Sequence, residues 1–271
     1  MHCAVLGDPI AHSLSPVLHR AGYAAVGLDW DYEPVRVGEA GLAAFVRGLD
    51  ASWRGLSLTM PLKRTALALA AEATTRARLA GVANTLVLDG GAVALADNTD
   101  LPGAVAAVRE RYDGPVTAGS VLGGGATAAS TGLALCELGA RTVALMVRSP
   151  ERAAEAVSAI ARHPSGPRVE VRSLAGDPVT GEVVVSTVPA GAQDPELVAR
   201  CADVPVVFEV LYDPWPTPLA AARRDGVLVG GMDLLVHQAA LQFELFTGIA
   251  APLEAMRTAG LDALSGRRAA G

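Results

Sequence analysis

The chain has 271 residues, of which 51% are hydrophobic and only 4% aromatic, and its formal net charge is −6. This length allows one large α/β domain or two smaller ones, and an aliphatic core suits buried parallel strands. The acidic balance, without a basic tract, argues against nucleic acid or an anionic membrane surface as a partner. Because no apolar run approaches the roughly 18 residues that span a bilayer and the N-terminus shows no cleavable leader, we expect a soluble, cytoplasmic protein.

Three cysteines, Cys3, Cys136 and Cys201, are odd in number and widely spaced. This spacing fits neither a disulfide framework nor a set of metal ligands. A reducing compartment therefore suits the chain, and we expect no metal site.

Short apolar runs alternate with helical stretches through the first hundred residues. The pattern predicts strands at 4–6, 31–35 and 55–58, and helices at 15–26, 41–49, 61–71 and 74–79. Strands at 84–88 and 92–96 flank Asp89-Gly90-Gly91, which is typical of a β-hairpin. The predicted order is therefore β-α-β and ends in an antiparallel element.

The same alternation continues downstream. A helix at 101–112 precedes a β-α-β unit at 120–122, 126–138 and 143–147. The remaining predicted elements are helices at 151–162, 219–224 and 238–246, and strands at 169–171, 183–186, 206–210 and 227–229. We expect the helix at 238–246 to return to the first domain and residues 267–271 to fray. The fold class is thus α/β with two domains: residues 1–101 plus 237–271 carry a mostly parallel sheet, and residues 102–236 form a Rossmann-like domain.

A glycine-rich loop opens the second domain. The strand ending at Leu122 leads into Gly123-Gly124-Gly125-Ala126-Thr127-Ala128, which fits G-x-G-x-x-A at the start of a helix. In this pattern the first glycine makes the turn, the second lets the backbone approach a pyrophosphate, and the helix N-terminus faces the phosphates. The loop predicts a dinucleotide site, although glycine-rich turns are common in a chain with 29 glycines.

The end of the next strand indicates which dinucleotide binds. An NAD site typically has an acidic residue there, whereas this chain has Arg148 and Ser149, with Arg152 one helical turn later. A guanidinium and a hydroxyl suit the 2′-phosphate of NADP. The alternative is that both arginines belong to a solvated helix start, and the nearby Glu151 weakens the case for phosphate.

Lys63 is the only lysine among 22 basic residues. Arginine keeps its proton in proteins, whereas a lysine amine can be tuned toward neutrality. The retained lysine therefore marks a place where a titratable amine matters, unless it is a leftover surface residue.

Polar side chains also gather in short segments of the first hundred residues. Ser13 and Ser15, just before a helix, form a small group of hydroxyls and N–H groups suited to an anion. Alternatively Ser15 only caps that helix, Asp100 only caps the next one, and Asn84 only holds a turn.

These segments resemble those of the shikimate dehydrogenases, and the resemblance runs from Gly7 to about Gly248. Its elements occur in order and are listed here: Gly7 to Pro16, Thr59-x-Pro61-x-Lys63, Gly81 to Thr85, Asn98-Thr99-Asp100, the glycine loop, Tyr212-Asp213-Pro214, Thr217-Pro218-Leu219, Leu235 to Ala240, and Thr247-Gly248. The ordered set is far more specific than any single motif.

The resemblance implies reversible, NADP-dependent reduction of 3-dehydroshikimate to shikimate, in the shikimate pathway to chorismate and the aromatic amino acids. It implies a substrate domain completed by the C-terminal helices, an NADP domain inserted into it, and a monomer or homodimer. Lys63 and Asp100 would be catalytic, and the substrate would be held by Ser13, Ser15, Thr59, Asn84, Tyr212 and Gln238. The cofactor would be held by Gly123, Gly124, Gly125, Ala126, Thr127, Arg148, Ser149 and Arg152, with Thr187, Val188, Val210 and Gly231 at the nicotinamide end.

The chain departs from the family pattern in a few places. Ser57 stands where the family usually has Asn, so we expect a lost hydrogen bond there. Val147 replaces the usual Asn before Arg148, and Ser186 to Gly191 replaces an Asn-Ala-Thr-Ser-x-Gly type of segment. These changes put the preference for NADP in question.

Rival hypotheses remain at this stage. One is a sibling oxidoreductase that takes quinate as well as shikimate, or uses NAD. Another is a non-catalytic NADP-binding regulatory paralogue, which we would expect to have lost Lys63 or Asp100. A third is a short-chain reductase, which needs a Tyr-x-x-x-Lys pair that this chain lacks.

Overall fold

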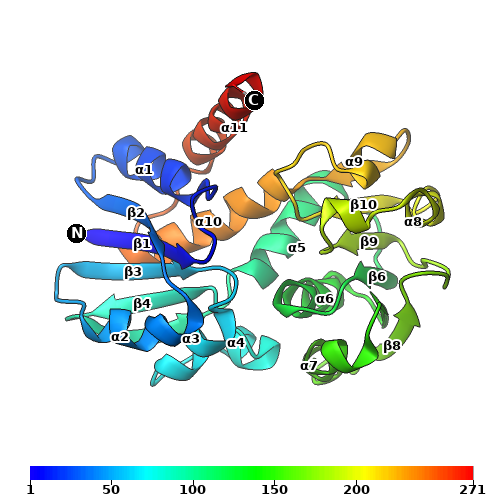
Figure 1. The fold of residues 1–271 in the computed structure, drawn as a ribbon, viewed down its shortest axis with the longest axis horizontal. Helices are drawn as coiled ribbons and strands as arrows, with labels where there is room; N and C mark the ends of the chain where they lie inside the picture. Colours follow the sequence, from blue (N-terminus) through cyan, green and yellow to red (C-terminus); the bar gives the residue numbers. More distant parts are fainter. Residues whose placement is uncertain (271) are drawn as a thin grey trace. The chain divides into compact units, whose positions relative to one another are not determined.

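The computed structural model describes residues 1–270, with side chains as far as Arg267. The chain forms two compact units (Figure 1): unit 1 is Met1–Thr99 with the segment from Leu235 onward, and unit 2 is Asp100–Leu234. The sequence predicted domain divisions after residues 101 and 236, and the structure places them two residues earlier, after Thr99 and Leu234. Each unit is described here by itself.

Unit 1 is built on a mixed sheet of five strands. The strands are β1 (His2–Gly7), β2 (Asp31–Arg36), β3 (Trp53–Leu58), β4 (Thr85–Asp89) and β5 (Ala92–Asp97), in the order β2-β1-β3-β4-β5. β1 runs parallel to β2 and β3, whereas β4 is antiparallel to β3 and β5. The predicted hairpin is confirmed, with Gly90 and Gly91 at φ 57° and 84° in its turn.

Helices cover both faces of this sheet (Figure 1). On one face, α2 (Leu42–Arg47) and α3 (Lys63–Leu69) bury Leu42 and Ala66 in a cluster with apolar side chains of β1 and β3, which the α3 N-cap Leu62 joins. On the other face lie α1 (Ser15–Ala25), α10 (Gly231–Thr247) and α11 (Leu253–Ala270). A Cβ at Gly55 of β3 would overlap the Phe246 ring, so glycine lets α10 lie directly against the strand. The short α4 (Thr75–Ala80) precedes the hairpin.

Unit 2 is a six-stranded parallel sheet. Its strands are β6 (Ala118–Leu122), β7 (Thr142–Val147), β8 (Arg168–Ser173), β9 (Val183–Ser186), β10 (Val206–Glu209) and β11 (Val227–Val229). Their order is β11-β10-β9-β6-β7-β8, and every neighbouring pair is parallel. This is the Rossmann order, so β6 and β9 flank the switch point where such folds bind their ligands.

Two layers of helices enclose the sheet of unit 2. α5 (Asp100–Arg111), α6 (Ala126–Leu138) and α7 (Pro150–Ala161) pack side by side on one face. α8 (Pro195–Arg200) and α9 (Pro218–Ala222) cover the other, where Leu197 and Leu219 join the buried cluster. The predicted Rossmann-like fold is therefore confirmed.

Several helix bounds differ from the prediction. α10 begins at Gly231 instead of residue 238, and α8 and α11 were not predicted. α11 continues to Ala270, and the Arg267 guanidinium donates to the His12 carbonyl at 2.8 Å, while the fraying of residues 267–271 stays a prediction. Gly271 lies outside the described residues.

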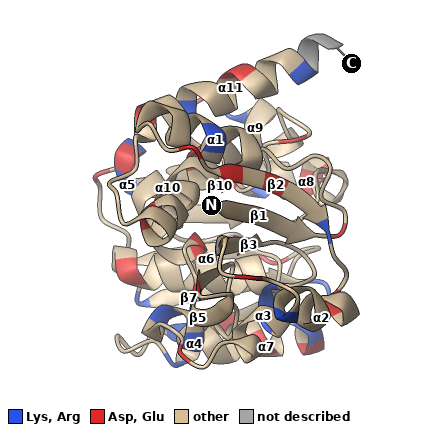
Figure 2. Cartoon of the chain, turned by 90° about the vertical axis from the view of Figure 1, so that its left-hand side faces the viewer, with Lys and Arg blue, Asp and Glu red and all other residues tan. Residues whose placement is uncertain are grey.

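Charged residues of both signs are interspersed along the helices in Figure 2. Within residues 1–270, no helix combines the length and apolar character that crossing a membrane requires.

Candidate active site

The polar segments of unit 1 meet at one edge of its sheet. β1, β3 and β5 share a direction, and β4 runs against them. The loops after β1, β3 and β5 and the residue before β4 therefore lie at the same edge. Backbone bonds join them: Thr59 N–H donates to the Leu6 carbonyl at 2.9 Å, and Ala83 N–H donates to the Lys63 carbonyl at 2.8 Å.

Thr59 and Lys63 follow β3. A Cβ at Gly7 would overlap the Thr59 methyl group, so only glycine at the end of β1 allows this approach. Lys63 is the first residue of α3, which begins later than the predicted Pro61, and its side chain is half-buried. The lone lysine thus stands at a helix start, hydrogen-bonded through its carbonyl to Ala83, the residue before Asn84.

Ser13 and Ser15 follow β1. The N-cap of α1 is Leu14, which excludes the alternative that Ser15 serves as the cap. Ser15 is buried, and its N–H donates to Ser13 Oγ at 3.3 Å. That N–H is therefore already engaged, and an anion here would meet chiefly the two hydroxyl groups.

Asn84, the residue just before β4, makes hydrogen bonds through both ends of its carboxamide. Its Oδ1 accepts from Thr99 N–H and from the Thr85 hydroxyl, both at 2.8 Å. Its Nδ2 donates to Thr99 Oγ1 at 2.9 Å and to Gln238 Oε1 at 3.4 Å. The structure therefore brings Asn84 and Gln238 together, although they are far apart in the sequence.

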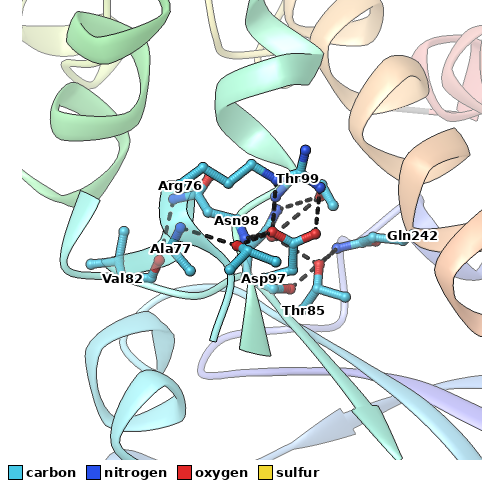
Figure 3. Close-up of polar contacts among 10 residues, drawn as sticks. Arg76, Ala77, Val82, Thr85, Asp97, Asn98, Thr99 and Gln242 are labelled. Carbon is cyan, nitrogen blue, oxygen red and sulfur yellow. Dashed lines mark hydrogen bonds and ion pairs between the residues drawn. The ribbon is translucent and has the colours of Figure 1, made fainter. Parts of the chain in front are cut away.

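Asp97 anchors the Asn98-Thr99-Asp100 segment (Figure 3). The Asp97 carboxylate is buried and accepts from Arg76 through both Nε, at 2.7 Å, and Nη2. It also accepts from the Thr74 hydroxyl at 2.5 Å and from Asn98 N–H at 2.7 Å. Asp100 follows directly as the first residue of α5 and is itself buried. Our sequence analysis missed Asp97 and Arg76, although a second acid next to Asn98 was a signal.

Ser57, where we expected a lost hydrogen bond, uses its hydroxyl both to accept and to donate. Its hydroxyl accepts from the Tyr32 phenol at 2.6 Å and donates to Gln242 Oε1 at 2.7 Å. These partners come from β2 and α10, so a short side chain suffices.

The glycine loop of unit 2 has the geometry of a phosphate cradle. Gly123 has φ +118°, and a Cβ there would overlap Thr187 Oγ1. A Cβ at Gly124 would come within 2.7 Å of the Ala153 Cβ. α6 then starts from its N-cap Gly125, so Ala126 and Thr127 occupy the first turn. A Cβ at Gly125 would meet nothing within 4 Å, so the backbone is open at the start of α6, where a pyrophosphate must approach, and the residues fit a dinucleotide.

Thr187 and Val188 lie beside this loop at the switch point. The Thr187 hydroxyl donates to the Leu122 carbonyl at 2.8 Å, and both side chains approach Gly123. They are thus brought together with the glycine loop.

The predicted 2′-phosphate residues follow β7. Arg148 and Arg152 are exposed, and Ser149 is the N-cap of α7. The Ser149 hydroxyl donates to Glu151 at 2.8 Å, and this bond lowers the pKa of Glu151. The Glu151 carboxylate therefore already accepts the hydrogen bond of the Ser149 hydroxyl, which our sequence analysis assigned to the 2′-phosphate of NADP.

Val210, Tyr212 and Gly231 lie near the end of β10. A Cβ at Gly231 would overlap the Val210 and Leu211 carbonyl oxygens, so α10 starts directly against this loop. Tyr212, which is partly buried, belongs to unit 2, whereas the other predicted substrate residues belong to unit 1.

Glu209, which our sequence analysis missed, holds this loop from inside. It is fully buried and accepts from Gln193 Nε2 at 2.6 Å, the Thr217 hydroxyl at 3.0 Å and Leu211 N–H at 3.1 Å. Burial raises the pKa of Glu209. Gln193 Nε2 also lies 3.1 Å from Ser186 Oγ, so one side chain links the loops after β9 and β10.

Comparison with known proteins agrees with this arrangement. The family model of the shikimate dehydrogenase substrate binding domain matches residues 5–86, and that of the shikimate 5′-dehydrogenase C-terminal domain matches residues 231–259.

Whole-chain relatives extend the match. The shikimate dehydrogenase (NADP(+)) of Desulfitobacterium hafniense is 35% identical over 97% of this chain and 98% of its own, and that of Methylobacterium radiotolerans is 38% identical over 90% of each chain. The crystal structure of Mycobacterium tuberculosis shikimate dehydrogenase superposes with a TM-score of 0.88 at 40% identity, covering 96% of this chain and 99% of that one. This chain belongs to the shikimate dehydrogenase family.

Proposed function

We propose that this chain is an NADP-dependent shikimate dehydrogenase that interconverts shikimate and 3-dehydroshikimate, with Lys63 and Asp100 as its catalytic pair. The observation that carries the proposal is the convergence of four polar segments on one sheet edge of unit 1. A small hydroxylated acid needs several polar groups to bind and orient it. This edge supplies two hydroxyls, a titratable amine, an oriented carboxamide and the Asn98-Thr99-Asp100 segment.

We infer that the substrate carboxylate binds the hydroxyls of Ser13 and Ser15. Thr59, Asn84, Gln238 and Tyr212 would then bind the ring hydroxyls or the carboxylate. Holding a small polyol in one orientation removes several kcal/mol of the barrier, on the order of 7 or more when geometry is ideal. Substrate affinity therefore depends on many weak polar contacts in fixed positions.

Lys63 is the proton acceptor in this proposal. As the alcohol is oxidised, its hydroxyl proton passes to the Lys63 amine, and in the reverse direction the ammonium returns a proton to the new hydroxyl. Asp100 orients the amine and the hydroxyl. An arginine could not take this role, because it keeps its proton, and the chain retains lysine at this one position.

The glycine loop, Gly123 to Thr127, would hold the pyrophosphate of NADP, and Arg148, Ser149 and Arg152 its 2′-phosphate. Thr187, Val188, Val210 and Gly231 would line the nicotinamide end. Bound NADP supplies the hydride acceptor, and the protein supplies placement and electrostatics. The bond between Ser149 and Glu151 favours a weaker preference for NADP over NAD than two arginines alone would give.

Three buried, free thiols suit a cytoplasmic enzyme, which we also infer. A monomer or a homodimer is compatible with a site assembled within one chain.

The direct test follows NADPH absorbance with purified protein, shikimate and NADP. We expect turnover, and we expect Lys63→Ala to lower kcat by about 10²–10⁴-fold with little change in the KM for shikimate. Arg64→Ala is the matched control, because it removes a neighbouring exposed charge without touching the proposed proton path. Full activity of Lys63→Ala would remove Lys63 from the mechanism, and no turnover by the wild type would overturn the proposed function.

A further inference from the structure

A chain of buried side-chain hydrogen bonds runs beneath Asn84 and Gln238 in unit 1. It starts at Tyr32 on β2, passes through Ser57 on β3 and Gln242 on α10, and reaches Thr85 at the start of β4. Tyr32, Ser57, Gln242 and Thr85 are all buried. We call these four residues the relay.

Two backbone groups fix the direction of every bond in the relay. The Asn84 carbonyl can only accept, and Gln242 Nε2 donates to it at 3.2 Å and to Thr85 Oγ1 at 3.0 Å. Gln242 Oε1 must therefore face Ser57, whose single proton it accepts at 2.7 Å. Ser57 then needs a donor of its own, and the Tyr32 phenol supplies it at 2.6 Å. Burial raises the pKa of Tyr32, so the phenol keeps its proton.

The other end of the relay sets the orientation of the Asn84 carboxamide. Thr85 Oγ1 accepts from Gln242, so its proton is available for Asn84 Oδ1 at 2.8 Å. Thr99 N–H, which can only donate, meets the same oxygen at 2.8 Å. Asn84 Nδ2 must then point the opposite way, toward Thr99 Oγ1 and Gln238 Oε1.

Gln238 is oriented in turn. Its Oε1 accepts from Asn84 at 3.4 Å, and its Nε2 donates to the Leu235 carbonyl at 2.9 Å. Gln242 lies one helical turn further along α10, so the two glutamines share a side of that helix. The hydrogen bonds of the relay therefore continue through Thr85 to Asn84 and from Asn84 to Gln238, the two carboxamides of the proposed substrate site.

We propose that Tyr32, Ser57 and Gln242 are positioning residues: they hold the Thr85 hydroxyl with its proton toward Asn84 and, together with the Thr99 and Leu235 backbone groups, keep the donor and acceptor ends of Asn84 and Gln238 in place for the substrate. This inference rests on the proposed function, because it names those two carboxamides as substrate ligands. A carboxamide turned end for end presents a donor where the substrate needs an acceptor, so one wrong orientation costs a bond and leaves a buried polar group unpaired.

Tyr32→Phe tests the first donor, and Tyr23→Phe is its matched control. Both tyrosines are buried in unit 1 and both changes remove one phenol oxygen. The Tyr23 phenol interacts with the Cys3 thiol and takes no part in the bonds of the relay. The Tyr32 ring stacks on His19 at 4.1 Å and 9°, and Phe keeps that stacking. Gln242→Met is the second relay variant, since it keeps side-chain length and removes both polar ends.

We expect Tyr32→Phe to raise the KM for shikimate about three- to tenfold, because one buried hydrogen bond is worth roughly that factor. Gln242→Met should have a larger effect, and the KM for NADP should stay unchanged in both variants. The side-chain amide signals of Asn84 in ¹⁵N–¹H spectra, assigned with Asn84→Asp, should move in both variants and stay in place in Tyr23→Phe.

An unchanged KM for shikimate in both relay variants would overturn the proposal, as would equal changes in the KM for shikimate and for NADP. Unmoved Asn84 amide signals would also overturn it. If the wild type does not turn over shikimate, the proposed function fails instead, and the amide signals still decide whether the relay orients Asn84.

Discussion

The acid sensitivity of unit 1 should depend strongly on His19. Its side chain is fully buried against the Tyr32 ring, with the Gln242 side chain beside it. Burial lowers the pKa of His19 from 6.5 to about 3, and the proximity of Gln242 offsets only part of that effect. The folded state therefore holds His19 neutral over most of the acid range.

The sign and size of the effect follow from proton linkage. As pH falls below 6.5, the unfolded chain binds a proton at His19 before the folded chain does, so the stabilisation is complete above 6.5 and is lost toward pH 3. Each pH unit inside that window costs about 1.4 kcal/mol. Between pH 7 and pH 5, His19 alone should lower the free energy of unfolding by about 2 kcal/mol.

Urea unfolding at pH 7 and pH 5 measures this loss, with wild type and His19→Phe compared in a Trp215→Phe background. Trp30 and Trp53 then report on unit 1 alone. We expect the wild type to lose about 2 kcal/mol more than His19→Phe over this range. Changing the exposed His12 to Gln should leave the pH dependence as in the wild type. Equal pH dependence in wild type and His19→Phe would refute the reasoning.

Three further outcomes are expected. Asp97→Asn should lower the free energy of unfolding by about 2–3 kcal/mol, because it leaves the Arg76 guanidinium without its buried carboxylate. A loss under about 0.5 kcal/mol in urea unfolding would contradict this. Glu209→Gln should cost about 1–3 kcal/mol in the same assay, because three donors face Glu209 and an amide cannot accept from all of them; an unchanged midpoint would count against it. In initial-rate kinetics, Arg148→Ala should raise the KM for NADP far more than the KM for NAD, and Glu151→Gln should lower the KM for NADP. Equal effects on the KM for both cofactors would show that neither residue contacts the 2′-phosphate.

Much of the fold could be predicted because strands of this chain are short apolar runs bounded by polar or glycine-rich turns. Every observed strand overlaps a predicted one, and the helix at 126–138 has the predicted bounds. α8 was missed although Asp194 and Pro195 are a typical helix start, with the Asp194 side chain accepting from Leu197 N–H at 2.8 Å. α11 was missed because its many small and polar residues give only a weak helical pattern of apolar positions. Met256 and Leu264 are buried in the structure, but the sequence alone does not show that they are.

The residues proposed to touch substrate or cofactor are recognisable from the sequence because the chemistry restricts them. A proton acceptor must titrate, and a phosphate loop needs glycine where a Cβ would collide with its neighbours. The residues that support the site are less restricted, because a buried donor needs only some acceptor and a buried acceptor only some donor. Ser57 illustrates the difference. From the sequence, serine in place of the family's Asn indicated a lost bond, yet Tyr32 and Gln242, which is 185 positions away, supply two partners. Which of many polar side chains meet across a sheet is decided by packing, and no local pattern encodes it. Departures from a family pattern at such supporting positions are therefore weak evidence of lost function, whereas a departure at Lys63 would have been strong evidence.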